Sequence, residues 1–183
     1  MKVYIISQIA AALSTIILLT YSVLKVNRRV ILICNIIINS LLTFHYYLLG
    51  SYTGAVCSGI TTVMVCVYYY KESIARYKVP IFNLPLIPTA FVCFFIVSGV
   101  LTWTDLWSCI PIIGNILLVI ALWNDNETKI KFIFIIVGIL WIIYNAHLKS
   151  VANVIGQMLA VTSNLIYMFR VFGLNKGKKS FSK

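Results

Sequence analysis

Long apolar runs, separated by short polar segments, occupy almost the whole of this 183-residue chain. An α-helix needs about 20 apolar residues to cross the hydrocarbon core of a bilayer, and each run has close to that length. The pattern therefore predicts an all-α membrane protein with seven transmembrane helices. The runs are Val3–Leu24, Val30–Leu49, Tyr52–Tyr70, Leu84–Trp103, Leu106–Trp123, Ile130–His147 and Val151–Val171.

The first and fourth runs need separate treatment. The first run continues to Leu24 and is followed by Lys25. It is too long for the apolar part of a cleaved signal peptide, and the charge is on the wrong side, so we expect a helix that is retained. The fourth run has Pro85 and Pro88 near its start. Because proline is tolerated in the first turn of a helix and breaks its interior, we expect this helix to begin near Leu86.

The basic residues indicate the direction in which the chain crosses the membrane. When seven helices alternate in direction, all 15 Lys and Arg residues except Lys2 and Lys149 fall on one side. Basic loops stay on the cytoplasmic side. We therefore expect the N-terminus outside and the C-terminus in the cytoplasm. One helix more or fewer would mix the two sides, so the charges also support seven helices.

The composition narrows the class of protein further. Apolar residues make up 61% of the chain and charged residues 10%, against roughly 45–50% and about 25% in soluble domains. These values exclude a soluble globular enzyme and a disordered chain. The net charge of +11 would suggest nucleic acid as the partner of a soluble protein. Here the orienting loops account for it, so the expected surroundings are the lipid bilayer, with no nucleic-acid partner.

The chain also resembles itself at a spacing of 99 residues. At this shift the first three runs align without a gap with the last three, and Gly50-Ser51 aligns with Lys149-Ser150. Both triplets begin on the same side because the fourth helix lies between them, so the repeats are parallel about an axis along the membrane normal. We predict a triple-helix repeat at 1–78, a linker helix at 79–104, a second triple-helix repeat at 105–172 and a basic cytoplasmic tail at 173–183.

Three segments carry a resemblance to a known family. They are the basic stretch at 25–29, the segment at 39–55, which contains the run from His45 to Gly54, and the segment at 141–145. Through them the chain resembles the YgjV family of small bacterial inner-membrane proteins, within the wider SWEET, SemiSWEET and PQ-loop group. The resemblance implies a 3+1+3 helix layout and a bacterial inner membrane, and it leaves the function open.

The chain departs from the wider group at two points. The first helix has Leu19-Thr20 near the place where that group has a Pro-Gln pair. Relatives that carry sugars have an Asn in the third helix of each repeat. Asn164 matches this pattern in the second repeat, whereas its counterpart in the first is Val65. The resemblance therefore supports a sugar site in one repeat only.

Neutral polar residues near the middle of the runs form the candidate site. No Asp, Glu, Lys or Arg lies in the middle of any run, whereas pumps coupled to ions or protons usually have an ionisable group there. Amides offer hydrogen-bond donors and acceptors without charge, and tryptophan adds a flat apolar face. We therefore predict a facilitative transporter of a small neutral polar solute, sugar- or nucleoside-like, by alternating access. The predicted substrate-binding residues are Asn39, Asn115, Trp141, Gln157 and Asn164.

A non-transporting membrane scaffold with the same fold is the alternative hypothesis, because Asn, Gln, Ser and Thr also hold membrane helices together. A polar cavity ringed by the predicted residues would favour transport, and a dry centre would favour the scaffold. Asn153, Gln157 and Asn164 are expected to share one face of the last helix. The oligomeric state stays open.

We expect neither enzyme activity nor a cofactor. The sequence has no nucleophile-elbow motif and no catalytic carboxylate pair, which are the signatures of two common hydrolase classes. His45 and His147 lack a second metal ligand at suitable spacing, so no metal site is expected.

Overall fold

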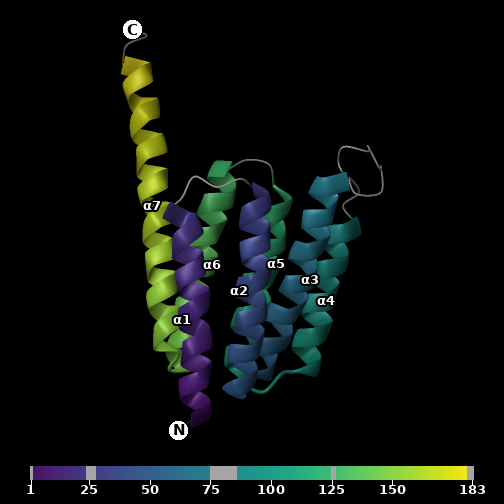
Figure 1. The fold of residues 1–183 in the computed structure, drawn as a ribbon. Coiled ribbons are helices and arrows are strands. Elements are labelled where there is room, and N and C mark those ends of the chain that lie inside the picture. Colours follow the sequence, from purple (N-terminus) through teal and green to yellow (C-terminus); the bar gives the residue numbers. More distant parts are fainter. Residues whose placement is uncertain (1, 24–27, 75–85, 125–126, 181–183) are drawn as a thin grey trace.

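The computed structural model describes residues 2–23, 28–74, 86–124 and 127–180. These residues form seven α-helices and one short 3-10 helix, η3, and the described ranges contain no strand (Figure 1). The prediction of an all-α membrane protein is confirmed. The helices are α1 (Lys2–Val23), α2 (Arg28–Leu48), α3 (Tyr52–Ile74), α4 (Leu86–Leu101), η3 (Leu106–Ser108), α5 (Cys109–Trp123), α6 (Glu127–His147) and α7 (Val151–Ser180).

Six segments are long and apolar enough to cross a membrane: α1, α2, α3, α6, α7, and η3 together with α5 (Leu106–Trp123). α4 is apolar but shorter, with 16 residues. Apolar segments in lipid form helices because a helix satisfies all its backbone hydrogen bonds internally. α4 begins at Leu86 as predicted, so Pro88 lies in its first turn. α7 continues beyond the apolar run to Ser180, although Gly173 and Gly177 are poor helix formers.

The six long helices form a ring, and α4 lies outside it (Figure 1). In the first triplet α1 packs on α2 and α2 on α3, and α5, α6 and α7 pack in the same order. The ring is closed by two seams, one between α1 and α7 and one between α3 and α5. Under the 99-residue shift these seams are equivalent, because α1 corresponds to α5 and α7 to α3. Only the α3–α5 seam is covered by α4.

The turns that end α2 and α6 are matched hydrogen bond for hydrogen bond. Gly50 has φ of 74° and its counterpart Lys149 has φ of 56°. The amide of Ser51 donates to the Tyr46 carbonyl at 3.0 Å, and that of Ser150 donates to the Asn145 carbonyl at 2.8 Å. Both turns are thus Schellman caps with a left-handed residue after the helix. This equivalence supports the internal repeat, while the predicted domain boundaries stay a prediction.

A buried apolar core lies where α4 meets the α3–α5 seam. Met64, Phe95 and Val119 are fully buried there. A Cβ on Gly99 would lie 2.2 Å from Ile112 Cδ1, so the glycine allows α4 to approach α5 closely. This packing gives the α5 side of the ring a fixed wall, and the candidate site is built against it.

Candidate functional site

A cavity of about 190 Å³ lies inside the ring, and all six ring helices contribute to its lining. The fold therefore brings together residues that are as much as 125 positions apart in the sequence, from Asn39 to Asn164. Helix packing alone accounts for their meeting, and their role in binding stays a prediction. The predicted residues that line the cavity are Asn39, Asn115, Trp141, Gln157 and Asn164.

The amides of Asn115 and Asn39 are partly engaged by the protein itself. Asn115 is 2% exposed. Its Oδ1 accepts from Thr61 Oγ1 at 2.6 Å, and its Nδ2 donates to the Pro111 carbonyl at 2.7 Å. Asn39 Nδ2 donates to the Asn35 carbonyl at 2.8 Å. These bonds fix the direction of both side chains and reduce what they can offer to a solute.

Gln157 and Asn164 present free amides to the cavity. Both lie on α7, are half-buried and line the cavity together with Ala160, at steps of three and four residues. Neither side chain forms a hydrogen bond with any part of the chain that the structure describes. Their donors and acceptors are therefore available to water or to a bound solute.

Asn153, which we expected on the same face of α7 as Gln157 and Asn164, is not among the residues that line the cavity. It is 5% exposed, and its Nδ2 donates to Asn145 Oδ1 at 3.3 Å instead of lining the cavity. Steps of four and seven residues bring side chains to one face of a helix, but they do not fix their depth. Asn153 lies in the first turn of α7, where it meets α6.

Trp141 gives the cavity an apolar wall at one end. Its ring stacks on that of Tyr46, with centroids 5.7 Å apart and an angle of 21° between the planes. An offset stack of this kind holds both rings in place. A Cβ on Gly114 would lie 3.4 Å from Trp141 Nε1, so the indole lies close to α5 as well.

Sequence reasoning missed further polar residues in the lining, and Lys131 is the most informative of them. It counted only as one of the basic residues on the cytoplasmic side, but α6 begins at Glu127, so Lys131 lies a turn inside the helix. It is half-buried, and its Nζ lies 5.4 Å from the centre of the Tyr167 ring. The steps from Lys131 through Phe134 to Trp141 follow a helical face, which was the available signal. The other polar residues of the lining that lie outside the predicted set are Asn35, Ser58 and Ser163.

A hydrogen-bonded layer lies between α2, α6 and the two matched turns, and we call it the axis layer. At its centre Tyr46 Oη donates to Asn145 Oδ1 at 3.0 Å, across a separation of 99 residues. A two-fold axis exchanges each residue with its counterpart, so two counterparts touch only where the axis passes between them. The axis layer consists of His45, Tyr46, Ser51, Tyr144, Asn145 and Ser150.

The rest of the axis layer obeys the same symmetry. Ser150 Oγ lies 2.9 Å from His45 Nε2, and the equivalent pair, Ser51 and Tyr144, forms a hydrogen bond between hydroxyls. His45 Nδ1 lies 2.7 Å from the Ser7 carbonyl, which can only accept, so Nδ1 donates and Ser150 donates to Nε2. The His45–Ser150 and Ser51–Tyr144 bonds each join one repeat to the other. His45 is fully buried and Tyr144 almost fully buried.

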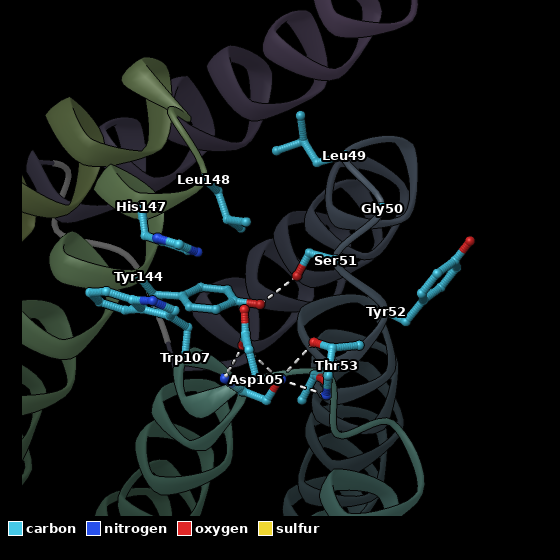
Figure 2. A pocket seen from close by; sticks show the side chains of 12 residues that line it. Leu49, Gly50, Ser51, Tyr52, Thr53, Asp105, Trp107, Tyr144, His147 and Leu148 are labelled. Atoms are coloured by element: carbon cyan, nitrogen blue, oxygen red, sulfur yellow. Dashed lines mark hydrogen bonds between the residues drawn. The ribbon is translucent and has the colours of Figure 1, made fainter.

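A second, smaller pocket of about 110 Å³ lies next to the axis layer (Figure 2). Ser51 and Tyr144 belong to both the layer and the pocket lining. Asp105 caps η3, with Oδ1 accepting from the Ser108 amide at 3.1 Å. Trp107 and His147 stack beside it, with ring centroids 4.3 Å apart. We call this polar space the outer pocket.

Six apolar helices around a cavity with amides in its lining, and a seventh helix packed outside this ring, define a polytopic, all-α membrane protein. Residues 5–174 match the Imp-YgjV family, described as bacterial inner membrane protein, and the chain belongs to this family. The predicted bacterial inner-membrane location is confirmed by this membership. No curated protein and no solved structure matches the chain. The wider SWEET, SemiSWEET and PQ-loop grouping stays a prediction, as does the orientation of the termini.

Proposed function

We propose that this protein is a facilitative transporter that moves a small neutral polar solute, sugar- or nucleoside-like, by alternating access. One observation carries the proposal: a single cavity at the centre of the ring gathers Asn39, Asn115, Trp141, Gln157 and Asn164. Ligand sites between the helices of a bundle have this combination of an apolar wall and a few convergent polar groups. The proposal includes no chemical step, and the partners it names are the solute and the lipid bilayer.

The free amides set the chemistry of binding. An amide both donates and accepts, so Gln157 and Asn164 can satisfy the hydroxyl groups of a polyol without a charge. The Trp141 ring offers an apolar surface to the face of a sugar or a base. Among the described residues of the lining, Lys131 is the one ionisable side chain, and none is acidic or a histidine. Proton relays in pumps usually use Asp, Glu or His, so this lining supports movement down a gradient over coupling to a proton.

The positive-inside rule gives the proposal its direction. It assigns the N-terminus to the outside and the end of the ring that carries Lys131 to the cytoplasm. The cavity lining extends toward that end through Asn35 and Lys131, and the axis layer closes the opposite end. The structure then corresponds to a carrier whose solute site faces the cytoplasm.

A non-transporting scaffold is the second candidate, and the engaged amides favour it. Asn115 bonds to Thr61 across the α3–α5 seam, and Asn39 bonds within its own helix. Such bonds hold membrane helices together, at about 0.6 kcal/mol each on average. Gln157 and Asn164 separate the two hypotheses, because a scaffold has no use for free amides that point into a cavity.

Counterflow uptake in proteoliposomes tests the proposal. The purified protein is reconstituted with a panel of labelled neutral sugars, nucleosides and amino acids. We expect uptake of one chemical class, and we expect Asn164→Ala and Gln157→Ala each to lower it about fivefold, the effect of losing a hydrogen bond of roughly 1 kcal/mol.

Thr162→Ala is the matched control. Thr162 lies on the exposed face of α7 and donates only to the Met158 carbonyl of its own helix, at 2.8 Å, so its loss should leave uptake unchanged. Uptake that is equally sensitive to Thr162→Ala would count against a site in the cavity. No uptake of any solute in the panel would favour the scaffold.

A further inference from the structure

The structure holds two polar spaces that one thin layer separates. Trp141 lines the central cavity and stacks on Tyr46, which belongs to the axis layer. Tyr144 and Ser51, also in the layer, line the outer pocket. The axis layer therefore adjoins both spaces, through Trp141 on one side and through Tyr144 and Ser51 on the other.

We propose that the axis layer is the outer gate of the transporter, that it opens as a unit when the two repeats rock apart, and that the outer pocket is the vestibule behind it. The inference rests on the proposed function and deepens it, because it assigns the moving part and the path. It stands on the position of the layer at the two-fold axis and on its reciprocal bonds.

The reciprocal bonds explain why the opening is concerted. The His45–Ser150 and Ser51–Tyr144 bonds each join one repeat to the other, and the symmetry relates one bond to the other. A motion that separates the repeats at this end therefore stretches both bonds together. The Thr61–Asn115 bond and the contacts of α4 hold the α3–α5 seam deeper in the ring, where a rocking motion needs a fixed contact.

The chemistry of the layer suits a seal that has to open. Among the buried side-chain atoms that the structure describes, only Gln8 Nε2 and Tyr68 Oη lack a hydrogen bond, so every buried polar atom of the axis layer is paired. When the layer opens, its polar groups lose their hydrogen-bond partners, and without water each unpaired group would cost free energy. The outer pocket, with Asp105, Thr104 and Ser108 in its lining, supplies a polar space from which water can reach them.

The close fit at Gly54 supports a closed gate. A Cβ at this position would lie 2.8 Å from Ser51 Oγ and 3.0 Å from Tyr144 Oη. Only glycine leaves room for the Tyr144 hydroxyl to reach Ser51 across the seam between the repeats. The layer is therefore packed tightly as well as hydrogen-bonded.

Thiol accessibility tests the gate without knowledge of the solute. The five native cysteines are replaced by alanine, and Ser163→Cys places one thiol in the cavity lining. A membrane-impermeant maleimide is then applied either to intact spheroplasts or to inverted membrane vesicles. Thr104→Cys, in the outer pocket, defines the outer face in a parallel sample.

We expect the Ser163→Cys thiol to be labelled rapidly from the face opposite Thr104→Cys and slowly from the same face. Ser51→Ala and Ser150→Ala each remove one reciprocal bond, and each should raise the slow rate about fivefold. If both bonds break in one motion, their free energies add, so the double variant should raise it about 25-fold. Ser40→Ala is the matched control, because Ser40 is exposed and donates only to the Ile36 carbonyl of its own helix.

Three results would overturn the gate: equal labelling from both faces before any change in the layer, no rise in either single variant, or a double variant no faster than the singles. Rapid labelling of Ser163→Cys from the face opposite Thr104→Cys shows that a variant has folded. If Ser51→Ala does not fold, Tyr144→Phe takes its place, because it removes the same hydrogen bond. The gate and the transport proposal fail separately. If the variants raise the labelling rate but the protein takes up no solute, the transport proposal fails and the gate stands. If the protein takes up solute but the variants leave the labelling rate unchanged, the gate fails and the transport proposal stands.

Discussion

The axis layer and the central cavity both contain asparagines, and these asparagines have different surroundings. In the layer, Asn145 is fully buried, accepts from Tyr46 and Asn153, and donates to the Trp141 carbonyl at 2.7 Å. In the cavity, Asn164 is half-buried and bonds to no described residue. α6 and α7, which carry the two asparagines, pack against each other.

This difference shows that residue type and position along a membrane helix do not decide what an asparagine does. An amide that forms all its hydrogen bonds with protein groups stabilises the bundle, because a buried amide without partners costs free energy. An amide that faces a cavity and has no protein partner contributes little to stability and is available to a ligand. The predictions below test this division, in order of decreasing effect on the free energy of unfolding.

Asn145→Ala should have the largest effect. It leaves the Tyr46 hydroxyl and the Asn153 amide without their acceptor in a buried place, and each stranded group costs about 1–3 kcal/mol. We expect a loss of about 2 kcal/mol or more in the free energy of unfolding, measured by chemical unfolding in detergent micelles. A loss no larger than that of a lipid-facing variant such as Ser40→Ala would contradict the structural role of the layer.

Tyr46→Phe should have roughly half that effect, about 1 kcal/mol. The variant removes one hydrogen bond, while the ring keeps its stack on Trp141 and Asn145 Oδ1 still accepts from Asn153. Tyr47→Phe is the matched control, because Tyr47 is the next residue and is 61% exposed. Equal unfolding free energies for the two variants would show that the Tyr46 hydroxyl does not contribute to the stability of the protein.

Lys149→Gly should stabilise the protein by roughly 0.5–1 kcal/mol. Lys149 has φ of 56°, and a left-handed conformation costs a residue with a side chain about 1–2 kcal/mol, part of which is offset by the greater freedom of glycine in the unfolded chain. The counterpart change, Gly50→Ala, should act in the opposite direction for the same reason. Thermal unfolding of both variants side by side measures the pair, and shifts of the same sign would mean that the two turns are not equivalent.

Asn164→Ala should have the smallest effect on stability, within about 0.5 kcal/mol of the unaltered protein, because no hydrogen bond to the described protein is lost. The same variant should lower solute uptake about fivefold. Unfolding and counterflow assays on one preparation give both values. A stability loss as large as that of Asn145→Ala would make Asn164 a structural residue and favour the scaffold.

Much of the fold was predictable because it depends on local sequence. The apolar runs predicted an all-α membrane protein, and proline chemistry placed the start of α4 at Leu86. The end of the last helix was not predictable in this way. The apolar run ends at Val171 and Gly173 and Gly177 follow it, which favours a helix end there, but α7 continues to Ser180.

The candidate site was predictable only in part. Mid-run position and polarity were enough to name five residues that the structure places around one cavity. They were not enough to separate Asn153, which bonds to Asn145, from Gln157 one turn further along α7. Lys131 was missed because it lies near the end of its run and counted only as a charge that orients the chain, whereas its place on the Trp141 face of α6 puts it in the lining.

The sequence by itself determined the number and extent of the apolar runs, the order of the repeats and the membership of the Imp-YgjV family. These properties follow from composition and periodicity, which act over a few helical turns. Only the tertiary structure decided which polar groups meet. Tyr46 and Asn145 bond across 99 residues because two helices of different repeats pack at one axis, and no local pattern specifies that contact. The same packing leaves Gln157 and Asn164 facing a cavity, which is why the axis layer and the solute site became distinguishable only in three dimensions.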